Sequence, residues 1–195
     1  MHVVDRFRAG LVAGPPASDQ TAADVVGWWH AVRADWFSQR PQFDLWFRAR
    51  YLDMHGAAAA GRLDAWADTA EGALALLILL DQFPRNAFRH TASMYATDAQ
   101  ARQIAGQAIE MEFDLQVEPE LRLFFYLPFA HSENMADQQL SVALNRRLGR
   151  PWLDHAQAHA AIIKRFGRFP HRNALLGRSM TAQEQAFLDQ GGFAG

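Results

Sequence analysis

Apolar side chains recur at helical spacing along most of the chain. After Pro41 they fall at i, i+3, i+4, i+8 and i+11, which predicts an amphipathic helix with one broad aromatic face. That face contains Phe43, Trp46, Phe47, Tyr51 and Met54. The run AEGALALLILLDQF, which follows Thr69, is apolar nearly all round. A helix without a polar face is buried, so this run predicts the central helix of the fold.

Capping residues and prolines predict where the other helices begin and end. Thr97 with Gln100, and Thr181 with Glu184, match the capping-box pattern at helix N-termini. Asp19 or Thr21 is expected to cap a first helix, Thr69 the central helix, and Ser132 a helix that runs to Leu148. Pro84 and Pro128 are expected to end the segments before them, and Pro119 to open the segment LRLFFYL. The segment from Pro151 to Phe166 predicts a helix that Gly167 stops.

Alternating strand patterns bracketed by hairpin turns are nearly absent. The sequence therefore predicts an all-α fold of antiparallel helix pairs. Residues 1–18 contain a Gly/Pro stretch and are interpreted as a flexible N-terminal arm, with residues 19–195 as a single helical domain.

Composition excludes several classes of function. The chain has 195 residues, a formal net charge of −2 and a pI of about 6.4, so we expect neither nucleic acid nor an anionic membrane as a partner. There is no cysteine, which excludes disulfides and thiolate ligands. Asp5, Arg6 and Arg8 interrupt the apolar stretch that a signal peptide needs, and the longest apolar run is too short to span a bilayer. We expect a cytoplasmic protein.

The first polar motif is DQFPRNAFR. Asp81 lies in the last turn of the predicted central helix, where the helix dipole disfavours a negative charge, so it needs a partner such as Arg85 or Arg89. The two arginines are four residues apart and share a helix face. They are either an anion clamp or members of a structural ion pair that fixes a turn.

The second motif is HSE. His131 and Glu133 lie next to a predicted helix N-terminus, where they could form a general acid/base pair or bind a metal. Acidic residues also favour the first turn of any helix, so Glu133 has a simpler explanation. His131 is harder to dismiss, because it directly follows the apolar run FFYLPFA.

The helix PWLDHAQAHAAIIKRF contains two histidines four residues apart. At 100° per residue, His159 falls within the apolar stripe and His155 on its border, so His159 is expected to point inward. The spacing H-x-x-x-H also suits a metal pair, but position 156 is Ala where a zincin helix has Glu. The hydrogen-bonded core histidine is the favoured interpretation, and no metal site is predicted.

The segment RFGRFPHRNALLGR has the highest density of polar side chains. Cationic and large aromatic residues alternate in it, so it is either a solvated surface loop or a binding site. Its candidates are Arg168, His171, Arg172, Asn173 and Arg178.

These motifs resemble a bacterial family of uncharacterised proteins, domain of unknown function nine-two-four. The resemblance rests on LLILLDQFPRNAFR, FFYLPFAHSE…DQ and IIKRFGRFPHRNALLGRSMTAQEQAFL, and it runs from about Val25 to Leu188. It implies a right-handed α-α superhelix similar to TPR-like folds, and it implies no reaction. The residues that match its motifs are Asp81, Gln82, Phe83, Pro84, Arg85, Asn86, Arg89, His131, Ser132, Glu133, Gln138, Phe166, Gly167, Arg168, Phe169, Pro170, His171, Arg172, Asn173 and Arg178.

Three functions stay open. In the first, the protein is a binding module that holds a small anionic ligand or an acidic peptide in a polar pocket. In the second, it is a hydrolase in which His131 or His171 acts as acid/base, Glu133 or Asp81 orients it, and arginines stabilise negative charge. In the third, the motifs are only structural contacts between helices. No cofactor is predicted. The candidate catalytic residues are His131, Glu133 and His171, and the candidate ligand-binding residues are Asp81, Arg85, Asn86, Arg89, His159, Arg168, Arg172, Asn173 and Arg178.

Overall fold

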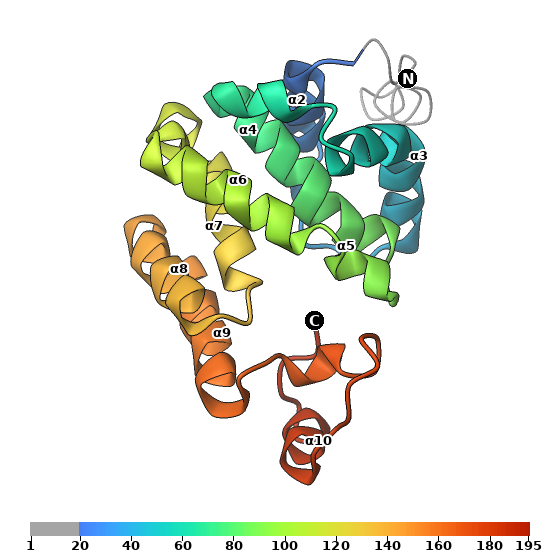
Figure 1. Ribbon diagram of the computed structural model, residues 1–195, viewed down its shortest axis with the longest axis vertical. Helices are drawn as coiled ribbons and strands as arrows, with labels where there is room; N and C mark the ends of the chain where they lie inside the picture. The colour runs from blue at the N-terminus through green and yellow to red at the C-terminus, as the bar shows by residue number, and fades with distance from the viewer. Residues whose placement is uncertain (1–19) are drawn as a thin grey trace.

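The computed structural model describes residues 20–195, which form helices joined by short turns, with no strand in that range (Figure 1). The predicted arm at residues 1–18 lies outside the described residues. The all-α prediction is confirmed, and the arrangement is consistent with a helical superhelix. The α-helices are α2 (Ala22–Ala31), α3 (Pro41–Ala59), α4 (Ala70–Leu77), α5 (Phe83–Ala87), α6 (Asp98–Glu110), α7 (Leu123–Ala130), α8 (Met135–Leu148), α9 (Trp152–Phe166) and α10 (Ala182–Asp189). Short helical turns between them are η2 (Arg33–Asp35), η3 (Asp64–Asp68), η4 (Ile78–Gln82), η5 (Ala92–Tyr95), η6 (Phe113–Gln116), η7 (Pro119–Leu121) and η8 (Pro170–Arg172).

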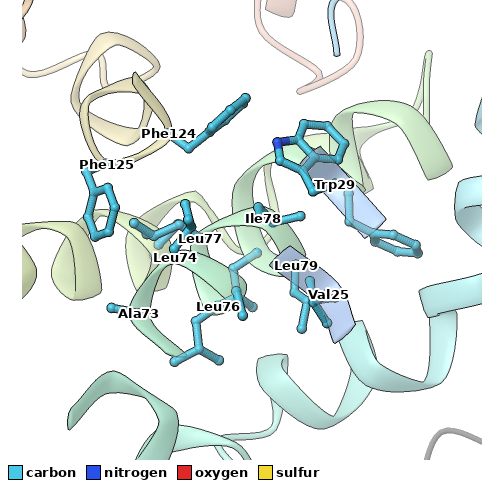
Figure 2. Packing of buried hydrophobic residues seen from close by; sticks show 14 of the residues in the cluster. Val25, Trp29, Ala73, Leu74, Leu76, Leu77, Ile78, Leu79, Phe124 and Phe125 are labelled. Atoms are coloured by element: carbon cyan, nitrogen blue, oxygen red, sulfur yellow. The ribbon is translucent and has the colours of Figure 1, made fainter. Parts of the chain in front are cut away.

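Helix α4 is the centre of the core, as its apolar sequence predicts. Every residue from Gly72 to Pro84 is buried. In Figure 2 its leucines lie between Phe125 of α7 and Val25 of α2. Burial of one large apolar side chain stabilises a fold by about 1.5–3 kcal/mol. The many such side chains on α4 therefore make this helix the centre of the hydrophobic core.

Gly72 allows α4 to touch the preceding turn η3. A Cβ atom at this position would lie 2.0 Å from the main-chain oxygen of Trp66. Such a distance is well inside van der Waals contact, so the close approach of the two backbones depends on the absence of a side chain.

Several predicted helix ends need correction. Pro84 does not close the central helix. The chain passes from α4 through the π-helical turn η4 into α5, and Pro84 occupies the first turn of α5, where its missing N–H costs nothing. Pro128 lies inside α7, which continues to Ala130.

Two predicted caps also differ from the structure. Asn134, not Ser132, caps α8. The Thr97 hydroxyl makes no cap on α6, because it donates instead to the main-chain oxygen of Leu80 at 2.5 Å. The other predicted caps, at Thr21, Thr69 and Thr181, are present.

The C-terminal part is built on the helix pair α8 and α9. After Gly167, which has a positive φ of 68°, the chain turns away from α9 towards α10 (Figure 1). Ile162, Ile163 and Phe169 form a small second core here. Because the segment after α10 returns towards α5, the C-terminal part faces the N-terminal part across the region described next. Among residues 20–195, no helix is both long and apolar enough to cross a bilayer.

Candidate functional site

A cavity of about 340 Å³ lies where the three polar motifs meet. Its wall comes from the turn before α3, from α5, from η5, from the end of α7, from η8 and from the C-terminal segment. A volume of this size is sufficient for a small organic ligand. The residues that line it are Trp36, Phe37, Ser38, Gln39, Gln82, Arg85, Asn86, Arg89, Met94, Tyr95, Leu127, His131, His171, Arg172, Phe193 and Gly195.

Asp81 lies behind this wall, in the π-helical turn η4, and is 1% exposed. A π-turn widens the helix and leaves carbonyl groups without their usual partners. His55 Nδ1 lies 2.9 Å from the main-chain oxygen of Leu79, and the Thr97 hydroxyl donates to the main-chain oxygen of Leu80 at 2.5 Å. Side chains from α3 and from the start of α6 therefore hold the turn that presents Asp81.

The Asp81 carboxylate contacts three side chains. His131 Nδ1 lies 2.8 Å from Oδ1, Arg85 Nη1 lies 3.1 Å from the same oxygen, and Gln82 donates to Oδ2 at 2.6 Å. Burial acts to raise the pKa of Asp81, but Arg85 and His131 outweigh it and hold that pKa well below its usual value. Asp81 is therefore ionised, and the predicted contact between Asp81 and Arg85 is present.

These contacts determine the protonation of His131. Burial lowers the pKa of His131, Arg85 lowers it further, and Asp81 opposes both effects. An ionised carboxylate only accepts hydrogen bonds, so the neutral ring carries its proton on Nδ1 and donates it to Asp81. The hydrogen bond that holds the ring is at Nδ1, so the other nitrogen, Nε2, keeps its lone pair. Because His131 lines the cavity, Nε2 is the nitrogen available to a ligand.

Gln138, which is fully buried on α8, fixes the backbone around His131. Its side-chain nitrogen donates to the main-chain oxygens of Ala130 at 2.8 Å and Ser132 at 2.6 Å. These carbonyls lie at the last residue of α7 and just beyond it, where carbonyls lack partners within the helix. One amide group therefore positions the residues on both sides of His131.

Arg172 is the least compensated cation of the site. It is 7% exposed, and its nearest carboxylate, Asp98, lies 3.6 Å from Nη1. Its guanidinium lies between the rings of Tyr95 and Phe169, at 4.5 and 4.6 Å from their centroids, and Nη2 donates to the His131 main-chain oxygen at 2.9 Å. Nε has no partner within residues 20–195. Burial lowers the pKa of Arg172, and Arg85 lowers it further.

The cavity presents positive charge. The described residues that line it include three arginines, Arg85, Arg89 and Arg172, and no Asp or Glu side chain. The acidic partners lie behind these arginines: Asp98 is 2.9 Å from Arg85, and Asp44 binds Arg89 through both oxygens, at 2.7 and 3.0 Å. A ligand in the cavity therefore meets the guanidinium groups and not the carboxylates.

His171 and His159 lie beside the C-terminal segment. Both rings pack against Phe193, with centroid distances of 5.1 Å for His171 and 4.6 Å for His159. Burial is the main cause that lowers the pKa of His171 to about 4 and of His159 to about 3. His171 lines the cavity, whereas His159 does not and packs against Phe169. The expected inward orientation of His159 is present, but the expected hydrogen bond is not found at Nδ1, which has no partner among the described residues.

Glu133, a candidate catalytic residue, does not line the cavity. Arg178 binds its carboxylate through two nitrogens, at 2.6 and 3.0 Å, and the main-chain N–H of Phe169 donates to it at 2.8 Å. Burial acts to raise the pKa of Glu133, but Arg178 lowers it overall. The carboxylate thus joins the start of α8 to the segment after α9. Asp81, not Glu133, contacts His131.

The other candidates form similar contacts between elements. Arg168 binds Glu184 at 2.6 Å, and Glu184 also completes the capping box of α10. Asn173 is buried. Asn86 lines the cavity, but its side chain donates to the Gln82 main-chain oxygen at 3.0 Å and accepts from Arg89 at 2.9 Å. Of these side chains only Asn86 lines the cavity, and its amide brings no charge to it.

Sequence reasoning did not single out four residues of the site. Tyr95 and Asp98 contact Arg172, while Trp36 and Phe37 form apolar wall. An acidic residue in the first turn of a helix, such as Asp98, is common for reasons of the helix dipole. The aromatic residues follow the general core pattern, so no signal in a single sequence distinguishes them.

One group within the described residues could offer three ligands to a metal ion. His30, Glu118 and Glu120 place their ligand atoms within 4.8 Å of one another. Hydrogen bonding already explains the arrangement, because His30 Nε2 lies 2.7 Å from Glu120 and 3.2 Å from Glu118. The group is largely exposed and does not line the cavity. His155, the partner considered for His159, is exposed.

Fold and site define an all-helical protein with a polar, arginine-lined cavity that has a buried Asp–His pair in its wall. Residues 25–192 match the family described as bacterial protein of unknown function (DUF924), and the chain belongs to that family. The solved structure of a protein of unknown function from Agrobacterium tumefaciens is similar, with a TM-score of 0.85 and 50% sequence identity over 87% of this chain and 97% of that one. A comparison with curated proteins gave no match.

Proposed function

We propose that the protein binds a small organic anion in this cavity, with the anionic group at Arg172 and an apolar body against the aromatic wall. Arg172 is the observation that carries the proposal. Its carboxylate neighbour, Asp98, is 3.6 Å away and is shared with Arg85, which lies closer at 2.9 Å, so the buried guanidinium is only partly compensated. Such a group is costly, and its lowered pKa expresses that cost. An anion that reached Arg172 would compensate its charge at shorter range.

The wall indicates the rest of the ligand. Beside the polar groups, the cavity is lined by Trp36, Phe37, Met94, Leu127 and Phe193. Apolar side chains of this kind favour a hydrocarbon body over a fully hydrated ion such as free phosphate. A short-chain carboxylate has both features.

Calorimetric titration with pentanoate tests the proposal, with inorganic phosphate and pentylamine as comparison ligands. Pentanoate should bind, and pentylamine should not. A charge-assisted hydrogen bond contributes about 1.5–3 kcal/mol, so Arg172→Gln should weaken pentanoate binding about 10- to 150-fold. Arg172→Lys keeps the positive charge but not the two-pronged geometry of the guanidinium, so it should lose less pentanoate affinity than Arg172→Gln does.

Arg165→Gln is the matched control, because Arg165 is exposed and lies over Phe166 outside the cavity. It should leave the affinity unchanged. Equal affinity of the wild type for pentanoate and pentylamine, or equal affinity of wild type and Arg172→Gln for pentanoate, would contradict the proposal.

A further inference from the structure

The Asp81–His131 pair has features that binding alone does not need. Its carboxylate is 1% exposed, its imidazole is held at Nδ1, which leaves Nε2 with a lone pair, and His131 lines the cavity. A carboxylate that orients a neutral histidine in this way makes the far nitrogen a proton acceptor.

We propose that His131 is a general base and that the protein hydrolyses a carboxylic ester of an organic anion, with water as the nucleophile. This inference rests on the proposed anion site. Arg172 would hold the anionic end of the substrate, and Asp81 would be the positioning residue for His131. Arg85 shares Asp81 Oδ1 with His131, and its Nη2 has no partner among the described residues, so it is placed to stabilise an oxyanion.

The reaction needs no further reactant. Nε2 of His131 takes a proton from water while the water oxygen bonds to the ester carbonyl carbon, and the carbonyl oxygen becomes an oxyanion beside Arg85. When the intermediate collapses, the bond from carbon to the leaving oxygen breaks. The proton on Nε2 passes to that oxygen, which gives a carboxylic acid and an alcohol and returns His131 to its neutral form.

Ser38 is the alternative nucleophile, since it also lines the cavity. Its hydroxyl makes no hydrogen bond with the described residues, His131 included. A serine nucleophile depends on a base within hydrogen-bond reach. We therefore assign the attacking oxygen to water, and Ser38→Ala should keep its activity.

The test compares two esters that differ at one end, mono(4-nitrophenyl) glutarate and 4-nitrophenyl pentanoate. Release of 4-nitrophenol should be faster with the anionic glutarate ester, through a lower KM. Arg172→Gln should raise KM for the glutarate ester by a larger factor than it raises KM for the pentanoate ester, because the anionic end alone depends on the guanidinium charge. His131→Gln should lower kcat at least about 100-fold, the ordinary contribution of a general base, while pentanoate still binds with wild-type affinity.

The variant Asp81→Asn tests whether Asp81 positions His131 for catalysis or only stabilises the fold. It should lower kcat and leave KM unchanged. The Asp81 charge acts to raise the pKa of His131, so the acidic limb of the kcat profile should move to lower pH in the variant. The titratable and charged groups that face His131 are Asp81, Arg85, Asp98, His159, His171 and Arg172. If the acidic limb of the kcat profile stays at the wild-type pH in a variant that still binds pentanoate, the role of Asp81 is overturned.

Failure of this inference can be distinguished from failure of the anion site. If the wild type binds pentanoate but hydrolyses the glutarate ester no faster than His131→Gln does, the hydrolytic reaction is refuted and the anion site stands. If pentanoate does not bind and neither ester is hydrolysed, both are refuted. Loss of activity in Ser38→Ala would overturn the assignment of water as the nucleophile.

Discussion

Replacement of Glu133 by Gln should destabilise the fold without affecting the cavity directly. The substitution removes the charge that Arg178 binds at 2.6 and 3.0 Å and leaves that cation with the Phe169 main-chain oxygen at 3.2 Å. The two side chains are 26% and 23% exposed. An exposed ion pair contributes about 0.2–1 kcal/mol, and breaking a buried one costs about 3–5 kcal/mol. A half-buried pair falls between these limits, at about 2 kcal/mol.

Thermal unfolding at pH 7 measures this loss. For a chain of this length, a loss of about 2 kcal/mol lowers Tm by about 4–8 °C. A double-mutant cycle with Arg178→Gln isolates the contact between the two side chains. Glu110→Gln is the matched control and should leave Tm unchanged, because Glu110 is at the exposed end of α6.

The pH dependence gives a second readout. The pKa of Glu133 is lowered in the folded state, so its contribution is present above the unfolded pKa, near 4.5, and is lost as the pH falls through the folded value. The difference between wild type and variant should therefore shrink in acid. A Tm change under 2 °C at pH 7, or a coupling energy close to zero, would show that Glu133 is not the structural contact described above.

Three further predictions concern stability. Gly72→Ala should cost about 2–4 kcal/mol in chemical denaturation, since the new methyl group meets the Trp66 oxygen at 2.0 Å; an unchanged midpoint would contradict the close approach. Gln138→Leu should cost about 2–4 kcal/mol, because it leaves the carbonyls on either side of His131 without a donor; a cost under 1 kcal/mol would show that other groups satisfy them. Burial lowers the pKa of His159 to about 3, so the unfolded chain binds a proton at this site first and stability falls as pH drops from about 6.5. His159→Phe should reduce that slope by up to about 1.4 kcal/mol per pH unit between pH 6 and 4, and an equal slope in urea titrations of the two proteins would exclude His159 as the cause.

Local patterns predicted the helices well and their ends less well. The apolar run of α4 and the caps at Thr69 and Thr181 depend on neighbours in sequence, so they were readable from it. Pro84 and Thr97 were misjudged for one reason. Tertiary contacts turn the end of α4 into a π-turn, in which Pro84 starts the next helix and Thr97 is drawn to the Leu80 carbonyl.

The sequence by itself determined that this protein is all-helical around one apolar helix, because helical periodicity is a local property. It also identified the three motifs that supply Asp81, His131 and Arg172. Only the tertiary structure decided the partners of these residues. His131 contacts Asp81, which is 50 residues away in sequence, while its near neighbour Glu133 binds Arg178. A charge pairs with whichever opposite charge the packing of helices brings within reach, and sequence spacing does not encode that distance.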